Sequence, residues 1–251
     1  MKQIIKRILH PVRELAAKFV NINYSNTIIY KGANLIAAEK VDGDYLEFGV
    51  FAGSSFIRSH QIIKDVFRQH QRLHEGRTEE DAMAIRRNWE SMRFFAFDSF
   101  QGLPKLEGID KQTSDFARGK YTYAERNFRN NLIKADVALD KVIIVPGWFN
   151  ETCTEETINK YAMKKASIIH VDCDLYTSAK TVLEFIEPLL TDGTVIIFDD
   201  WYTFRGNPNL GEQRAFNEWK ATMTDWIFSE YQKEGPARNS FIASKRNVSG
   251  G

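Results

Sequence analysis

The feature that most constrains this chain is the stretch YLEFGVFAGSS at residues 45–55. Apolar, β-favouring residues come first, a turn with Gly49 and Gly53 follows, and two serines precede an amphipathic run. This order predicts a buried strand, a tight turn and the start of a helix, which is how Rossmann-like folds form a nucleotide site. We therefore expect a ligand at the carboxyl end of this strand.

Strand and helix patterns alternate along the chain. Apolar runs predict strands over residues 44–49, 93–98, 141–146, 167–172 and 194–199, with a weaker strand pattern over 228–243. Helical spacing predicts a helix capped by Ser54 or Ser55, another around residues 82–89, and a third over 179–190 that ends at Asp192 and Gly193. The alternation predicts a Rossmann-like α/β fold, with a mostly parallel, twisted sheet and helices on both faces.

The composition suits one sizeable folded domain. The chain has 251 residues, of which 43% are hydrophobic, and its net charge is +1. Its 34 basic and 33 acidic residues form no long block of one sign, so we expect no nucleic-acid partner. Cys153 and Cys173 lack metal-type spacing, which predicts reduced thiols in a cytoplasmic protein, with Cys173 in the core.

The first twenty residues mix basic and apolar side chains. Their apolar run is too interrupted for a signal peptide or a membrane span. We expect residues 1–40 to form a helical N-terminal extension that packs on the body or across a homo-oligomer interface, and residues 41–251 to form the main domain. A helix that associates weakly with a membrane surface is the alternative.

The glycine turn indicates the kind of cofactor. It lacks the full G-x-G-x-x-G of pyrophosphate binders and carries Glu47 inside the strand, which suits a cofactor with a cationic or amino-bearing end. S-adenosylmethionine is such a cofactor. Asp98 ends the second predicted strand, the position from which such folds bind ribose hydroxyls. The alternative is that Asp98 caps a turn.

Four aspartates follow two later strands. His170, Asp172 and Asp174 are two residues apart, so they share one face as their strand ends. A crossover of 27 residues separates Asp172 from Asp199, which places Asp199 and Asp200 on a neighbouring parallel strand. Clustered carboxylates repel one another, and Mg²⁺, Mn²⁺ or Ca²⁺ would relieve this repulsion. Helix capping with a solvated Asp174 is the alternative.

Five motifs in order resemble those of the macrocin O-methyltransferase family, metal-dependent class I methyltransferases that modify sugars on natural products. They are LEFGV at 46–50, FDSFQGLP at 97–104, GWF at 147–149, VDCDLY at 171–176 and DDWY at 199–202. The resemblance covers roughly residues 44–220. It implies the metal ligands Asp172, Asp199 and Asp200, the general base Asp174, and a cofactor pocket with Glu47, Gly49, Gly53, Ser54, Asp98 and Ser99.

The function implied by the resemblance is Mg²⁺-dependent transfer of a methyl group from S-adenosylmethionine to a hydroxyl of a sugar or glycosylated natural product. His170 is a rival base, or a histidine packed in its strand. Residues 105–123 form a long polar and aromatic connection that predicts a lid over the substrate. Four aromatic residues could stack on the acceptor or pack in the core: Tyr121, Tyr123, Trp201 and Tyr202. Arg205, Asn207 and Asn209 are expected to meet the acceptor.

Three alternatives stay open at this point. A catechol-type O-methyltransferase has a similar set of strand-end acids, although its last position is usually Asn. An NAD-dependent oxidoreductase would share the strand, turn and helix but would not need the four aspartates. A non-catalytic partner protein built on the same fold would be expected to lose its metal ligands or its base.

Overall fold

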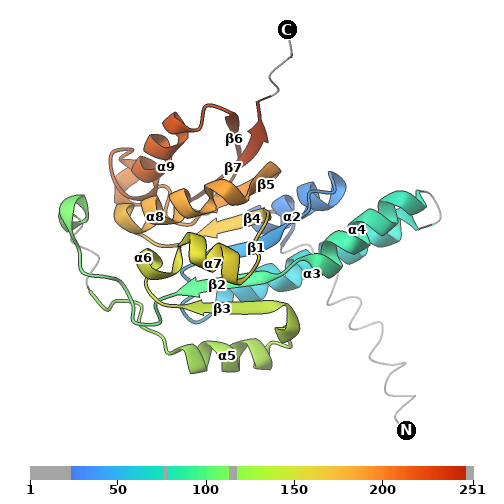
Figure 1. Cartoon of the computed structure of the whole chain (residues 1–251), viewed down its shortest axis with the longest axis horizontal. Coiled ribbons are helices and arrows are strands. Elements are labelled where there is room, and N and C mark those ends of the chain that lie inside the picture. Colours follow the sequence, from blue (N-terminus) through green and yellow to red (C-terminus); the bar gives the residue numbers. More distant parts are fainter. Residues whose placement is uncertain (1–23, 76–77, 113–117, 247–251) are drawn as a thin grey trace.

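The computed structural model describes residues 24–75, 78–112 and 118–246. Within them, one sheet of seven strands has the order β3-β2-β1-β4-β5-β7-β6 (Figure 1). The strands are β1 Asp44–Phe48, β2 Phe94–Asp98, β3 Val142–Pro146, β4 Ala166–Val171, β5 Leu190–Phe198, β6 Trp226–Glu234 and β7 Arg238–Lys245. The first five are parallel, whereas β7 runs antiparallel to both β5 and β6. Ligands of doubly wound sheets bind where the strand order reverses, which here is at the carboxyl ends of the paired strands β1 and β4.

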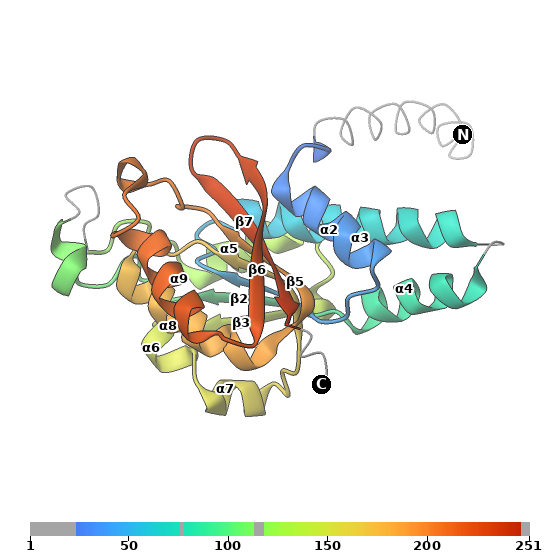
Figure 2. The same ribbon diagram turned by 90° about the horizontal axis from the view of Figure 1, so that it is seen from above.

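Helices cover both faces of the sheet (Figure 2). One face packs on α2 Ile28–Ala38, α3 Ser54–His74, α4 Glu79–Ser91 and α5 Glu125–Lys134. The other packs on α6 Phe149–Thr152, α7 Glu155–Lys160, α8 Tyr176–Ile186 and α9 Gly211–Thr222. Neighbouring strand residues alternate between the two cores, so Tyr45 faces α3 while Leu46 faces α8. Both faces of the parallel strands are therefore buried, as the sequence predicts.

The five predicted parallel strands are confirmed within a few residues, as is the strand pattern over 228–243, but the predicted end of the helix over 179–190 needs correction. The weak strand pattern over 228–243 is two strands, β6 and β7, joined as an antiparallel hairpin. Asp192 and Gly193 do not end a helix, because they lie inside β5. The chain leaves α8 through a 3-10 turn over Glu187–Leu189, and Leu190 then pairs with Ala166 of β4.

The start of α3 differs from the prediction of a serine cap. Gly53 precedes the helix with a left-handed φ of 88°, and no side chain caps the helix end. A Cβ atom at Gly53 would lie 2.7 Å from the ring of Phe128, so the turn is too tight for a serine there. Ser55 instead donates its hydroxyl to the carboxylate of Glu47.

The described part of the predicted N-terminal extension forms α2. Ala33, Ile36 and Ala37 are fully buried and belong to the same core cluster as α3. Residues 1–23 lie outside the described residues, so the extension, its homo-oligomer contact and the domain division at residue 40 stay predictions. Within the described ranges, no helix has the length and the apolar character needed to cross a bilayer.

Candidate functional site

An open cavity of about 820 Å³ lies at the carboxyl ends of β1, β2, β4 and β5. Seven of the predicted site residues line it: Gly49, Asp98, Ser99, Asp172, Asp174, Asp199 and Asp200. Glu47, Gly53 and Ser54 do not line it, and Ser54 borders a separate cavity of about 140 Å³. The structure therefore brings the predicted acids and the first glycine to one cavity.

The glycine turn brings the ends of β1 and β4 into contact. Gly49 has a φ of 92°, and a Cβ atom there would lie 1.8 Å from the carbonyl oxygen of Asp172. In the same contact, the amide of Asp172 donates to the carbonyl of Phe48 at 2.9 Å. Any larger residue at position 49 would separate the two strand ends, so glycine is required here.

Asp98 braces this turn. Its carboxylate accepts hydrogen bonds from the amides of Val50 at 2.8 Å, Phe51 at 2.9 Å and Phe100 at 2.7 Å. Phe51 itself has a positive φ of 43°, and its ring is 45% exposed. These contacts favour the alternative in which Asp98 caps a turn, and its contact to a ribose stays a prediction.

Glu47 lies in the interior, below the cavity. It is 0% exposed, and it accepts hydrogen bonds from the hydroxyls of Tyr45 and Ser55. A ring nitrogen of His170 lies 3.8 Å from its carboxylate. Any effect of Glu47 on a bound cofactor therefore acts through its charge or through these neighbours.

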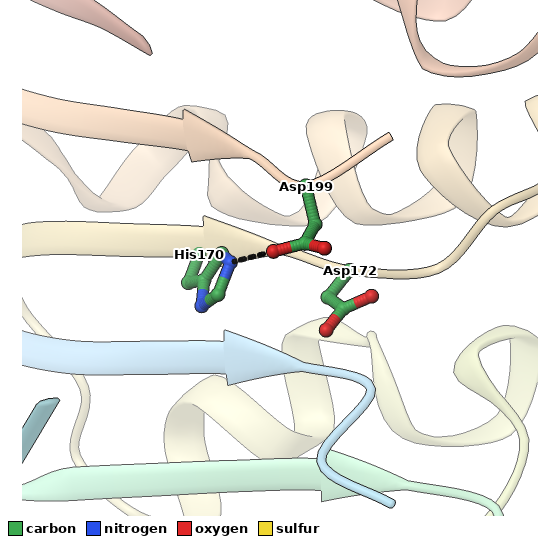
Figure 3. A group of neighbouring side chains, drawn as sticks. All are labelled: His170, Asp172 and Asp199. Carbon is green, nitrogen blue, oxygen red and sulfur yellow. Dashed lines mark hydrogen bonds and ion pairs between the residues drawn. The ribbon is translucent and has the colours of Figure 1, made fainter. Parts of the chain in front are cut away.

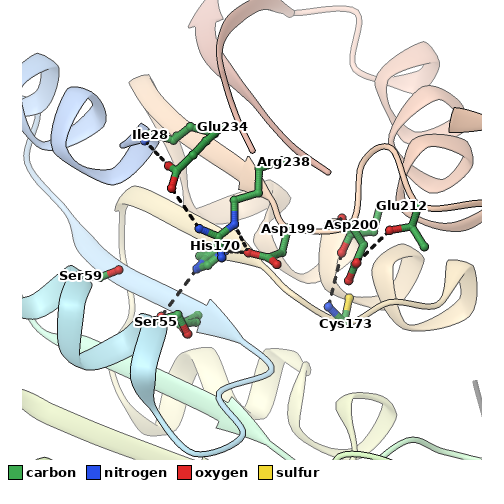
Figure 4. A network of polar contacts seen from close by, with 12 residues as sticks. Ile28, Ser55, Ser59, His170, Cys173, Asp199, Asp200, Glu212, Glu234 and Arg238 are labelled. Atoms are coloured by element: carbon green, nitrogen blue, oxygen red, sulfur yellow. Dashed lines mark hydrogen bonds and ion pairs between the residues drawn. The ribbon is translucent and has the colours of Figure 1, made fainter. Parts of the chain in front are cut away.

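His170, Asp172 and Asp199 form a close group at the ends of β4 and β5 (Figure 3). Each offers an atom that could bind a metal, and these atoms lie within 4.8 Å of one another. His170 Nε2 lies 3.2 Å from Asp199 Oδ1, and Arg238 Nε lies 2.6 Å from the same oxygen (Figure 4). Two cationic or polar groups thus hold one oxygen of Asp199 and leave the other available.

Asp174 and Asp200 form a second pair. Asp174 has a left-handed φ of 59°, and its carboxylate is close enough to that of Asp200 for the two to affect each other's pKa. The hydroxyl of Thr203 donates to Asp200 at 2.9 Å. Of the three predicted metal ligands, the structure therefore groups Asp172 with Asp199 and turns Asp200 toward Asp174.

Burial and mutual repulsion set the charge of these acids. Burial, together with the charge of Asp199, raises the pKa of Asp172 well above its usual range. Burial and the charge of Asp200 raise the pKa of Asp174 to about 8. For Asp199, burial also raises the pKa, but the hydrogen bond to His170 and the charge of Arg238 outweigh it and lower the pKa. Asp199 is thus the acid of this group for which the counter-charges outweigh the burial.

The donor set of this cluster fits a hard divalent cation. No donor among the described residues contacts the carboxylate of Asp172, although three other aspartates lie close enough to raise its pKa. A cation is the partner that such a carboxylate lacks, and oxygen ligands favour Mg²⁺, Mn²⁺ or Ca²⁺.

Several residues of the site were not predicted as such. Arg238 comes from the antiparallel strand β7, and Glu212 from the first turn of α9 contacts both acidic loops. Phe51 and Arg118 also line the cavity. Of these, Phe51 lies in the predicted glycine turn and Arg118 in the predicted lid segment, so these two carried a local signal.

The predicted acceptor residues divide between cavity and core. Tyr121 lines the cavity, whereas Trp201 is 7% exposed and packs on Phe198 and Phe241. For Trp201, the packing alternative is therefore the correct one. Three residues expected to meet the acceptor do not line the cavity: Arg205, Asn207 and Asn209.

Backbone hydrogen bonds join the two ends of the long connection after β2. The amide of Leu103 donates to the carbonyl of Lys120 at 2.9 Å, and that of Gly119 donates back to Leu103 at 3.0 Å. Asp110 accepts hydrogen bonds from the amides of Tyr176 and Thr177, which attaches the connection to the start of α8. Residues 113–117 lie outside the described residues, and the role of this segment as a lid stays a prediction.

Comparison with known proteins identifies the family. The sequence profile of the macrocin-O-methyltransferases (TylF) matches residues 80–225. The chain belongs to the macrocin-O-methyltransferase family. It is 30% identical over 172 residues to 8-demethyl-8-(2,3-dimethoxy-alpha-L-rhamnosyl)-tetracenomycin-C 4'-O-methyltransferase of Streptomyces olivaceus, which covers 66% of this chain and 56% of that relative. The chain thus spans little more than half the length of the curated relatives it matches.

Solved structures of O-methyltransferases share the fold. The O-methyltransferase NovP matches with a TM-score of 0.62 and 20% identity, over 87% of this chain and 78% of NovP. An O-methyltransferase from Bacillus cereus, solved in complex with SAH, matches with a TM-score of 0.53 and 14% identity, over 97% of this chain and 96% of that one. The predicted Rossmann-like class I methyltransferase fold is therefore confirmed.

Proposed function

We propose that this chain is an S-adenosylmethionine-dependent, Mg²⁺-dependent O-methyltransferase that acts on a sugar hydroxyl of a glycosylated natural product. Membership of the macrocin-O-methyltransferase family supports the reaction, and the rhamnosyl group in the name of the Streptomyces olivaceus relative supports the acceptor class. One observation carries the proposal. Four aspartates on two neighbouring strand ends line the same cavity as the glycine turn.

The cofactor would occupy the part of the cavity beside Gly49, Asp98 and Ser99. A volume of about 820 Å³ lies within the ~300–1,000 Å³ that small-molecule and cofactor sites usually have, so there is room for a nucleoside. Bound there, S-adenosylmethionine supplies an electrophilic methyl group. Asp98 accepts the amides of Val50 and Phe51 and thereby fixes the turn that would border this ligand.

Asp172, Asp199 and Asp200 would hold Mg²⁺ or another hard divalent cation. Such an ion lowers the pKa of a bound hydroxyl and orients it. The chain itself contributes the orientation of Asp199, because His170 and Arg238 hold its Oδ1. Both groups also neutralise charge, so His170 acts here as a partner of Asp199 and Glu47, and not as the base.

Asp174 would accept the proton of the acceptor hydroxyl at a carboxylate oxygen. It lines the cavity, and without a cation burial and the neighbouring acids raise its pKa to about 8. A bound cation would lower this pKa, so coordination of the hydroxyl would supply much of the deprotonation. The left-handed backbone at Asp174 turns the chain sharply between β4 and α8. Such strain at a cavity wall is typical of a functional position.

The test is a methyl-transfer assay with S-adenosylmethionine and a panel of glycosides, nucleotide sugars and catechols, with and without EDTA. We expect transfer to a glycoside that stops in EDTA and returns with Mg²⁺. Full transfer in EDTA would contradict the metal, and transfer to catechols alone would favour the catechol-type alternative. Calorimetry with S-adenosylhomocysteine and NAD separates a methyltransferase from an oxidoreductase, and binding of neither would favour the non-catalytic alternative.

A further inference from the structure

The first turn of α9 packs directly against both acidic loops. Gly211 begins the helix with a φ of 54°, and a Cβ atom there would lie 2.5 Å from the ring of Phe204 and 3.6 Å from the carbonyl oxygen of Asp174. The side-chain amide of Gln213 donates to the carbonyl of Trp201. The turn is therefore anchored to the loop after β4 at one point and to the loop after β5 at another.

Glu212, between these two residues, bonds to both loops at once (Figure 4). Its Oε2 accepts the amide of Asp200 at 3.0 Å, and its Oε1 accepts the amide of Cys173 at a longer 3.4 Å. Each amide belongs to a loop that carries predicted metal ligands or the predicted base. Glu212 is thus a bridge between the two loops.

A carboxylate at this position is costly for the fold. Glu212 is 1% exposed, and burial together with the charges of Asp200 and Asp172 raises its pKa well above the usual range. A glutamine of the same shape would carry less charge into an already acidic site. It has one acceptor oxygen, however, and its NH₂ group would face the second amide, so one of the two bonds would be lost.

We propose that Glu212 is a positioning residue that fixes the spacing between the loop after β4 and the loop after β5, and thereby the spacing of Asp172 from Asp199 and Asp200. This inference rests on the proposed function, since it assumes that those three aspartates bind a divalent cation. Residues that orient metal ligands typically change metal affinity about 10–100-fold when they are replaced. Glu212 does not itself line the cavity, although the two residues whose amides it accepts, Cys173 and Asp200, do.

The test compares Mn²⁺ and S-adenosylhomocysteine binding by calorimetry in the full chain. Glu212→Gln should weaken Mn²⁺ binding about 10–100-fold and change S-adenosylhomocysteine affinity by less than about twofold. Glu218→Gln is the matched control, because it removes the same charge from the exposed side of the same helix. It should bind Mn²⁺ like the wild type. A Glu212→Gln variant with wild-type Mn²⁺ affinity would overturn the inference.

A second variant separates geometry from charge. Glu212→Asp keeps the carboxylate but is one methylene shorter, so it can reach one loop and not both. Weaker Mn²⁺ binding in both variants supports the bridge, whereas wild-type affinity in Glu212→Asp would mean that charge alone matters and would overturn it.

Two further outcomes are distinguishable. A wild-type chain that binds S-adenosylhomocysteine but no Mn²⁺ would overturn the metal in the proposed function and this inference with it. If the variants fail to fold, hydrogen exchange of the metal-free wild type decides, since the amides of Cys173 and Asp200 should be protected at least tenfold relative to free peptides. Unprotected exchange at both amides would show that the bridge does not form.

Discussion

Asp98 and Asp172 occupy the same kind of position and have opposite surroundings. Asp98 ends β2 and Asp172 follows β4, so both lie at the carboxyl edge of the parallel strands, and both line the same cavity. Asp98 accepts hydrogen bonds from the amides of Val50, Phe51 and Phe100. Asp172 has no donor among the described residues and lies among other acids that raise its pKa. The fold supplies hydrogen-bond donors to the first carboxylate and, within the described ranges, none to the second.

This difference shows how one residue type serves two purposes at one sheet edge. A carboxylate that backbone amides satisfy stabilises a turn, because each bond to a charged acceptor is favourable. A carboxylate grouped with others is destabilising without a cation, which is a property that binding sites retain for function. Asp199 lies between these cases, since Arg238 and His170 satisfy one of its oxygens.

The largest effect is expected for the acid that we assign as the base. Asp174→Asn keeps the shape of the side chain but removes its ability to accept a proton, so turnover should fall on the order of 10²–10⁴-fold. Mn²⁺ affinity measured by calorimetry should stay within a few-fold of the wild type. Full turnover by this variant would remove Asp174 from the mechanism and return His170 to consideration.

The satisfied aspartate should act mainly on stability. Asp98→Ala removes the acceptor of three backbone amides at the glycine turn, which we expect to cost about 3 kcal/mol in the free energy of unfolding. Denaturant unfolding measures this loss. Calorimetry with S-adenosylhomocysteine tests the cofactor pocket, since unchanged affinity in Asp98→Ala would contradict the predicted ribose contact.

Substitutions of the proposed metal ligands should weaken metal binding and leave cofactor binding nearly unchanged. Asp199→Ala and Asp200→Ala each remove carboxylate oxygens from the cluster, so Mn²⁺ affinity should fall at least about tenfold. S-adenosylhomocysteine affinity should change little. Equal Mn²⁺ affinity in both variants and the wild type would place the cation elsewhere or remove it.

The sequence predicts the parallel part of the fold well, because its signals are local. Buried runs such as residues 44–48 and 166–171 must be strands, and the glycine turn must follow the first of them. The hairpin of β6 and β7 was harder to predict, since its strands mix buried and exposed residues and β7 pairs with β5, which is far away in the sequence. The limits of α8 and β5 depended on the pairing of Leu190 with Ala166, which local propensity cannot show.

The acids of the site were predictable, but their partners were not. Strand ends and crossover length bring the four aspartates to one cavity, as the sequence indicates. Two of the donors that distinguish Asp98 from Asp172, the amides of Val50 and Phe51, come from the turn after β1. Arg238 is 39 residues beyond Asp199 on an antiparallel strand. Glu47 illustrates the converse, because its place beside the glycine turn predicted a cofactor contact while its side chain points into the core.

The smallest expected effect distinguishes Asp98 from Asp172 most clearly. An Asp→Asn substitution should change the free energy of unfolding with opposite signs at these two positions. In EDTA, Asp172→Asn should raise the free energy of unfolding by about 1 kcal/mol, since it removes a buried charge from a repulsive group. Asp98→Asn, the matched control, should lower it because it loses a charged acceptor.

The pKa of Asp172 is raised in the folded protein, so its protonated form stabilises the fold and this contribution is lost as pH rises from about 4 through the raised pKa. The gain from Asp172→Asn should therefore be largest at alkaline pH, disappear near pH 4, and reverse when saturating Mn²⁺ stabilises the wild type alone. A loss of stability in Asp172→Asn at alkaline pH in EDTA would show that the fold, and not a ligand, satisfies this carboxylate.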